Sequence, residues 1–118
     1  MSVQPQPRLS GRATISPKRL QKCLEQMLTI REFEHLGERE FKNGLIRGYY
    51  HSYAGQEAVG VGFLGALDLK RDYIVDHYRD HGHCLLAGID PHAIFAELFG
   101  RSTGVSKGKG GSMHMYSP

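Results

Sequence analysis

The first hydrophobic pattern in the chain is helical and begins at Ser16. Serine is a favoured N-cap residue, and Pro17 suits the first helical position. Apolar side chains then recur at mostly helical spacing, at Leu20, Cys23, Leu24, Met27, Leu28, Phe33 and Phe41. The spacing predicts one continuous amphipathic helix from Ser16 to about Asn43. Its solvated face is expected to carry the charged residues Arg31, Glu34, Glu38 and Lys42.

The residues before this helix show no hydrophobic period. Residues 1–15 are rich in Gln, Pro, Arg and Ser, a composition that cannot bury enough apolar surface to order itself. We therefore expect a disordered tail over 1–15 and an ordered region over 16–118.

The next two segments differ sharply in polarity. Residues 45–54 combine Tyr and His with Gly and lack a clear period, so an ordered loop is expected there. Residues 56–67 are apolar on nearly all sides and contain three glycines, although glycine weakens a helix by about 1 kcal/mol relative to alanine. This segment is predicted to be a buried helix whose glycines allow close packing against other backbone.

The second half of the chain suggests an α/β arrangement. Residues 73–75 form a short β-branched and aromatic run that is typical of a buried parallel strand. A short helical stretch is expected over 84–87, and Asp90 and Pro91 cap another helix that ends at Gly100. Residues 101–118 form a basic, glycine-rich segment that is expected to be a flexible loop.

Composition narrows the possible functions. The 118 residues carry 15 Lys and Arg against 12 Asp and Glu, which suits an anionic small molecule better than a nucleic-acid groove. No stretch has the ~18 to 20 consecutive apolar residues of a membrane span, and no secretory signal is present. A transit peptide is disfavoured by Pro5 and Pro7. Cys23 and Cys84 lack a metal-binding spacing, so free buried thiols are expected rather than a disulfide.

Three motifs have both a functional and a structural interpretation. The glycines and lysines of 104–111 could cradle a phosphate, but Gly110 follows Lys109 where a P-loop requires Ser or Thr. A flexible loop or a wall beside an anionic ligand is therefore favoured. The histidines of 77–83 lack the glutamate of a zinc signature, so hydrogen-bonding roles at the surface or strand end are expected. Arg79 with its neighbour Tyr78 follows the predicted strand and suits phosphate binding, whereas the structural alternative is an ion pair.

The motifs, taken in order, resemble one family. They are Arg31-Glu32-Phe33-Glu34, Gly44-Leu45-Ile46-Arg47-Gly48, His51 with Gly55-Gln56-Glu57-Ala58, Tyr78-Arg79-Asp80-His81, Glu97-Leu98-Phe99-Gly100 and Gly108-Lys109-Gly110-Gly111-Ser112-Met113-His114. From about Leu20 onward the chain is similar to the alpha subunit of thiamine-diphosphate-dependent 2-oxo acid dehydrogenases, the group that includes pyruvate and acetoin dehydrogenases.

The resemblance implies both a cofactor and its contacts. Such a subunit, with a beta subunit in a heterotetramer, decarboxylates a 2-oxo acid on thiamine diphosphate and passes the acyl group to a lipoyl acyltransferase core. Tyr78 and Arg79 would bind the diphosphate, and His51 would lie near the diphosphate and the reactive end. His114 would be the catalytic candidate, on a loop near the active-site entrance. The expected compartment is the cytoplasm, or the mitochondrial matrix in a eukaryote.

The chain also departs from the family pattern. Members carry Gly-Asp-Gly and a later Asn-Asn that hold a magnesium ion, yet this sequence has no Gly-Asp-Gly and only one Asn, Asn43. We therefore expect residues 16–118 to be the N-terminal part of the dehydrogenase domain, a truncated α/β fold with N-terminal helices and the start of a parallel sheet. No metal ligand is assigned, and the chain alone is expected to be inactive. The alternative is a small self-sufficient module that binds phosphate or nucleic acid.

Overall fold

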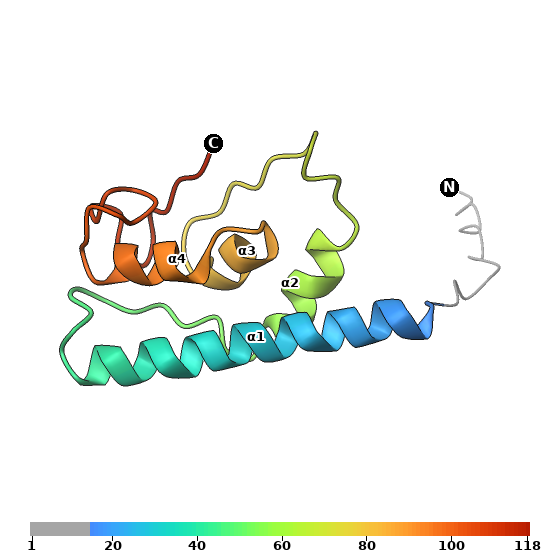
Figure 1. Cartoon of the computed structure of the whole chain (residues 1–118), viewed down its shortest axis with the longest axis horizontal. Helices are drawn as coiled ribbons and strands as arrows, with labels where there is room; N and C mark the ends of the chain where they lie inside the picture. The colour runs from blue at the N-terminus through green and yellow to red at the C-terminus, as the bar shows by residue number, and fades with distance from the viewer. Residues whose placement is uncertain (1–14) are drawn as a thin grey trace, which may run out of the picture.

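The structure is a computed structural model that describes residues 15–118, and within that range it contains helices and loops. The helices are α1 (Pro17–Lys42), α2 (Glu57–Leu64), α3 (His81–Leu86) and α4 (Pro91–Leu98). Helix α1 runs along one side of the molecule, and the three short helices lie together on the other side (Figure 1). The predicted tail over 1–15 falls, apart from Ile15, outside the described residues.

Helix α1 confirms the predicted long helix at both ends. The Ser16 side chain accepts a hydrogen bond from the backbone N–H of Arg19 at 3.3 Å, and Pro17 is the first helical residue. Asn43 caps the last turn, and Gly44 leaves the helix with a left-handed φ of 75°. The expected solvated face is wrong at Glu34, which is fully buried because polar groups from two other segments surround its carboxylate.

Helix α2 is shorter and less buried than predicted. It ends at Leu64, and only one face is covered, so Val59 and Phe63 remain 70% and 66% exposed. The prediction of burial on all sides was therefore wrong, because α1 and α3 contact α2 from one side. Close packing explains Gly60, where an added methyl group would lie 2.5 Å from the Tyr53 hydroxyl oxygen. It does not explain Gly62, which faces open space.

The predicted strand over 73–75 is not seen. This segment is irregular, and its Tyr73 and Val75 side chains are 93% and 94% exposed. A strand needs a neighbouring strand to pair its backbone groups, and residues 15–118 contain no strand with which this segment could pair. The described part of the fold is thus helical. Helix α3 also begins at His81, three residues before the stretch predicted, whereas α4 begins at Pro91 after the Asp90 cap as expected.

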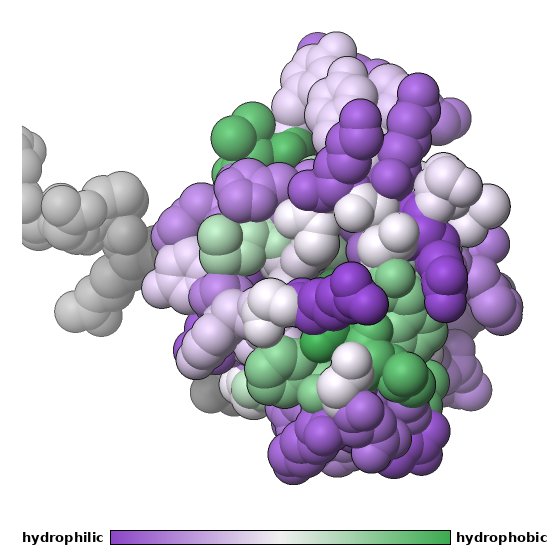
Figure 2. Space-filling model, turned by 90° about the vertical axis from the view of Figure 1, so that its left-hand side faces the viewer, coloured by the Kyte–Doolittle hydropathy of each residue, from purple (hydrophilic) through white to green (hydrophobic). Residues whose placement is uncertain are grey.

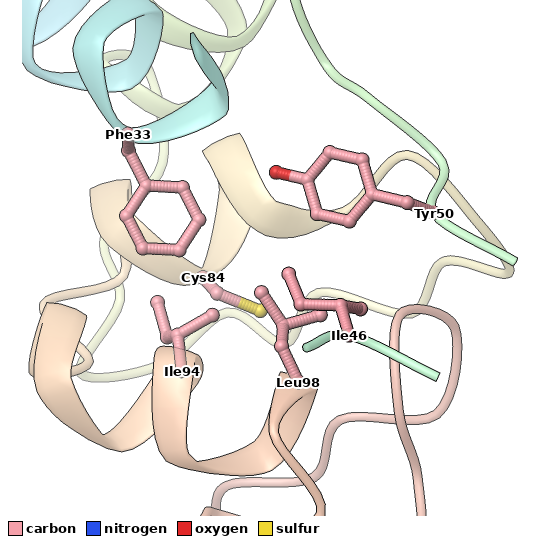
Figure 3. Close-up of a cluster of buried hydrophobic side chains, with 6 residues drawn as sticks. All are labelled: Phe33, Ile46, Tyr50, Cys84, Ile94 and Leu98. Atoms are coloured by element: carbon pink, nitrogen blue, oxygen red, sulfur yellow. The ribbon is translucent and has the colours of Figure 1, made fainter. Parts of the chain in front are cut away.

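The main core lies where α1, α3, α4 and the 45–54 loop meet. Phe33 comes from α1 and Cys84 from α3, and the remaining members are Ile46, Tyr50, Ile94 and Leu98 (Figure 3). Both cysteines are free thiols, as predicted, although Cys23 is only half-buried. Burial raises the pKa of the Cys84 thiol to about 12, so this thiol is un-ionised at neutral pH.

Some hydrophobic surface stays uncovered. Leu20, Leu24 and Leu28 lie one turn apart on α1 and are each more than half exposed. On the end of the molecule where α1 finishes, hydrophobic side chains form a patch that hydrophilic ones surround (Figure 2). No helix among residues 15–118 is long and apolar enough to cross a membrane.

An ion pair joins α1 to the start of α2. The Arg31 Nε lies 2.5 Å from a carboxylate oxygen of Glu57, and both oxygens of Glu57 also accept the backbone N–H of Gly55 at 3.1 Å. The hydrogen bond from Arg31 is the largest influence on Glu57 and lowers its pKa from 4.5 to about 2. The pair therefore holds the loop before α2 against α1.

The glycine-rich loop of residues 104–111, here called the Glu97 loop, wraps around a buried carboxylate of α4. Glu97 is fully buried, and its oxygens accept backbone N–H groups at 2.6 to 3.2 Å from Ser106, Gly108, Gly110 and Gly111. Burial alone would raise the pKa of Glu97, but these bonds together lower it.

The structure adds a second argument against the phosphate-cradle interpretation, which the sequence already disfavoured. A phosphate cradle requires free backbone amides, and four amides of the loop are already bound to the Glu97 carboxylate. Four hydrogen bonds to Glu97 thus hold in place a loop that was expected to be flexible or to form a wall beside an anionic ligand. Glycine is required at Gly104, where an added methyl group would lie 2.5 Å from Glu97.

The two inner glycines of α2 provide a matched test of its packing. We expect Gly60→Ala to destabilise the protein by about 1–2 kcal/mol, because the methyl group overlaps the Tyr53 hydroxyl. Gly62→Ala should instead stabilise it by about 0.5–1 kcal/mol, since it meets nothing and favours the helix. Urea unfolding of both variants measures the difference. Changes of the same sign would contradict the described packing of α2.

The Glu97 loop predicts a large effect of a single substitution. Glu97→Ala should destabilise the protein by about 3 kcal/mol, because four backbone donors lose a charged acceptor. Chemical unfolding measures this loss, and hydrogen exchange should rise at the four amides. Glu32→Ala, on the exposed surface of α1, is the control and should change stability by less than about 0.5 kcal/mol. Equal effects of the two substitutions would refute the loop's dependence on Glu97.

The Arg31–Glu57 pair predicts a pH dependence. Because the folded pKa of Glu57 is about 2 and its ordinary value is 4.5, the pair stabilises the fold above pH 4.5 and loses this effect as the pH falls towards 2. Unfolding free energies of the wild type and Glu57→Gln should therefore differ at pH 7 and converge near pH 2. A difference that is independent of pH would show that the ionised carboxylate contributes nothing.

Candidate functional site

Three of the four residues singled out from the sequence lie together. The rings of His51 and Tyr78 meet edge to face with centroids 5.2 Å apart, and the Arg79 guanidinium carbon lies 5.9 Å from the centre of the Tyr78 ring. We call these three residues the His51 cluster. His51 belongs to the loop between α1 and α2, whereas Tyr78 and Arg79 precede α3. The fold therefore brings together two segments that the sequence separates widely.

The backbone and side chain of Arg79 are both unusual. Its φ is 58°, a left-handed value that few residues other than glycine adopt, and such strain concentrates at functional sites. Its Nη1 donates a hydrogen bond to the Ser52 carbonyl oxygen at 3.0 Å. The structural alternative was an ion pair with Asp76 or Asp80, and no such pair involves Arg79 within residues 15–118. Most of its N–H groups remain free for a ligand.

The ring of His51 offers an unused polar atom. Its Nδ1 is buried and has no hydrogen-bond partner among the described residues. Buried polar atoms are nearly always paired, so an unpaired one indicates a missing partner. The cluster thus presents an exposed phenol and an exposed guanidinium beside His51, and these two donors suit an anionic ligand.

Next to this cluster lies a chain of buried polar side chains, here called the buried network. Glu34 of α1 accepts hydrogen bonds from the Tyr50 hydroxyl at 2.7 Å and from His81 Nδ1 at 2.9 Å. His81 Nε2 lies 2.9 Å from the Ser112 hydroxyl oxygen, which also accepts the backbone N–H of His51 at 3.0 Å. The network therefore connects α1, α3 and two loops to the backbone of the His51 cluster.

One protonation pattern satisfies every member of the network. If neutral His81 carries its proton on Nδ1, it donates to Glu34 and accepts the Ser112 O–H. Tyr50 then donates to the other Glu34 oxygen. Burial first and the Glu34 charge second raise the pKa of Tyr50 far above its ordinary value, which keeps this donor protonated. The arrangement is well suited to holding geometry rather than moving protons.

Sequence reasoning missed these residues. The histidines of 77–83 were expected at the surface or at a strand end, but His81 is fully buried. A usable signal was present on α1, because the buried residues Ile30, Phe33, Glu34 and Gly37 lie within two turns on one face. No comparable signal singles out Ser112, whose role depends on where the Glu97 loop ends.

The catalytic candidate His114 lies elsewhere. It is exposed and, with Met113, Asp80 and His83, lines a hollow of about 600 Å³. Asp80 is buried there, which raises its pKa, and its Oδ1 has no hydrogen-bond partner among residues 15–118. The structure therefore joins His51, Tyr78 and Arg79, whereas among residues 15–118 it shows no hydrogen bond or ring pair between His114 and these three.

Two of the three clustered histidines, His77 and His83, share Asp76, whose carboxylate lies 2.6 Å from His83 Nδ1. His77 lies 3.4 Å from Asp76 on the surface, and His83 Nε2 lies 3.0 Å from the Tyr53 hydroxyl. His81 faces Glu34 from the opposite side of α3's first turn. Within residues 15–118 no group of three or more metal-ligating side chains is suitably placed to hold an ion.

Comparison with known proteins gives one consistent result. A family model described as "Dehydrogenase E1 component" matches residues 25–118. The pyruvate dehydrogenase E1 component subunit alpha of Zymomonas mobilis is 48% identical over 111 residues, and that of Rhizobium meliloti is 49% identical over 96 residues. The mitochondrial protein of the same name from Kluyveromyces lactis is 44% identical over 112 residues.

These alignments cover most of this chain but only a small part of each relative. They include 94%, 81% and 95% of this chain, but only 31%, 27% and 26% of the three relatives. The chain thus spans less than a third of the length of the curated relatives it matches. The family match covers the His51 cluster, the buried network and the Glu97 loop. On this match the chain belongs to the Dehydrogenase E1 component family.

Proposed function

We propose that this chain is the N-terminal part of the alpha subunit of a thiamine-diphosphate-dependent 2-oxo acid dehydrogenase, with pyruvate as its substrate. The relatives' names support the substrate, because each is called a pyruvate dehydrogenase subunit. The observation that carries the proposal is the His51 cluster, in which His51 and Tyr78 lie beside an exposed guanidinium that uses one N–H group to bind Ser52. Residues 16–118 would belong to the cofactor-binding domain.

The residues present fit thiamine diphosphate. Arg79 offers a planar fork of donors for diphosphate oxygens, and Tyr78 offers a hydroxyl beside it. His51, whose ring meets Tyr78 edge to face, would lie near the diphosphate and the reactive end. When bound, the cofactor supplies an electron sink for the carbanion that decarboxylation leaves. His114, separate from the cluster, would act on the loop near the entrance.

Magnesium and partner chains complete the proposal. The described residues hold no suitable ligand group for an ion, so other residues of the complete subunit would hold the magnesium. Those other residues would also form a sheet. The segment with the exposed Tyr73 and Val75 side chains would pair with this sheet as a strand. A beta subunit and a lipoyl acyltransferase core would be the partners. Such a complex would work in the bacterial cytoplasm or the mitochondrial matrix.

The alternative of a small phosphate-binding or nucleic-acid-binding module receives less support. It relied on the glycine-rich loop, yet the backbone amides of this loop bind Glu97. Lys107 and Lys109 remain exposed, but no aromatic side chain alternates with them to stack on bases.

Substitution of Arg79 tests the proposed site. In the complete alpha subunit assembled with its beta subunit, Arg79→Ala should remove a charge-assisted bond of about 1.5–3 kcal/mol, a roughly 10- to 150-fold loss of affinity for thiamine diphosphate. Arg79→Lys should recover only part of it, because lysine lacks the planar fork. Isothermal titration calorimetry gives the dissociation constants.

The control for this experiment is Arg71→Ala. Arg71 is also exposed but lines the hollow near His114 rather than the His51 cluster, so cofactor affinity should stay unchanged. If Arg79→Ala lowers the melting temperature and leaves the affinity as in the wild type, Arg79 has a structural role and the proposed diphosphate site is wrong.

A further inference from the structure

Three members of the buried network are hydrogen-bonded in the same way as the serine, histidine and acid of a hydrolytic triad. Ser112 lies 2.9 Å from His81 Nε2, and His81 Nδ1 lies 2.9 Å from Glu34, which matches a nucleophile, a base and an orienting acid. Burial argues against that chemistry. His81 and Glu34 are fully buried and Ser112 is 6% exposed, so no substrate carbonyl reaches the hydroxyl. The network must therefore serve another purpose.

The contacts of the Ser112 hydroxyl indicate what the buried network does. It accepts the backbone N–H of His51 at 3.0 Å, a contact between residues 61 positions apart in the chain. With neutral His81 protonated on Nδ1 and bound to Glu34, the Ser112 O–H donates to His81 Nε2. The Ser112 oxygen is therefore left to accept the His51 N–H. This hydrogen bond ties the backbone of His51 to the interior of the fold.

Ser112 is itself placed from two sides. The Glu97 loop ends at Gly110 and Gly111, whose N–H groups bind the Glu97 carboxylate at 2.6 and 3.2 Å. Ser112 follows directly, and on its other side the network holds the hydroxyl. Two buried carboxylates, Glu97 and Glu34, thus determine where the Ser112 oxygen lies.

We propose that Ser112 is a positioning residue that, through His81 and Glu34, fixes the backbone of His51 and so keeps the His51 ring beside Tyr78 and Arg79, the residues proposed to meet the ligand. The proposal rests on the proposed function for the identity of that ligand, thiamine diphosphate. The positioning of His51 is a property of the chain itself. It is therefore testable without the cofactor.

Hydrogen exchange of the His51 amide is the direct test. In Ser112→Ala this amide loses its acceptor and should exchange about tenfold faster than in the wild type, which corresponds to about 1.4 kcal/mol. The amides of α1 serve as the internal reference, because a general loss of stability would accelerate them equally. NMR exchange on the 118-residue chain gives these rates.

Ser106→Ala is the matched control from the same segment. The Ser106 hydroxyl donates to the His114 carbonyl at 2.9 Å and accepts the N–H of Tyr116 at 3.0 Å, without contact to His51. Its loss should accelerate exchange at Tyr116 and leave His51 unchanged. If both variants change His51 exchange equally, or neither does, the positioning role is refuted.

A second variant and a ligand measurement complete the design. Ser112→Cys keeps nearly the same volume but is a weak hydrogen-bonding group, so it should also accelerate His51 exchange if Ser112→Ala fails to fold. In the assembled complete subunit, both variants should weaken thiamine diphosphate binding about three- to tenfold. Wild-type protein that does not bind the cofactor would refute the proposed function, while the exchange result would still test positioning. Covalent labelling of Ser112 by a fluorophosphonate probe would overturn the proposal in favour of a nucleophile.

Discussion

The burial of the Glu34 carboxylate is the constraint on which the arrangement of this molecule depends. An ionised carboxylate without partners is very costly inside a protein, so donors must come to it from elsewhere in the chain. Tyr50 and His81 provide them, one from the loop after α1 and the other from α3. Alternative packings that separate these segments leave a buried charge unpaired. A small apolar core thereby gains one defined geometry.

Glu97 imposes the same requirement on the other side of the core. The charge is met there by backbone rather than side chains, and the loop must curl until four N–H groups face one carboxylate. This requirement explains a glycine-rich composition that otherwise resembles a phosphate-binding loop. The carboxylate of α4 occupies the position that a phosphate would take.

Local signals in the sequence were sufficient for α1 and α4. Ser16 with Pro17, and Asp90 with Pro91, define the start of each helix through interactions within one turn. The features that the sequence did not predict correctly depend on contacts between residues far apart in the chain. The sequence places Glu34 on the surface, because it does not show that Tyr50 and His81 surround its carboxylate. It also predicts a strand over 73–75, although residues 15–118 contain no strand to pair with it. For the site, the proximity of His51 to Tyr78 and Arg79 is a property of the fold, whereas the recognition of each residue came from its motif.

The bond between Ser112 and His51 also bears on the order in which the chain folds. It closes a loop of 61 residues, whereas the hydrogen bonds of α1 each span a single turn. Closing a long loop costs entropy before any contact rewards it, so local helices form first and distant contacts follow. The bond between Ser112 and His51 then forms after the helices, and the ligand-facing segment acquires its shape only at that moment. A nascent chain that has not yet delivered residue 112 has its helices but not its site.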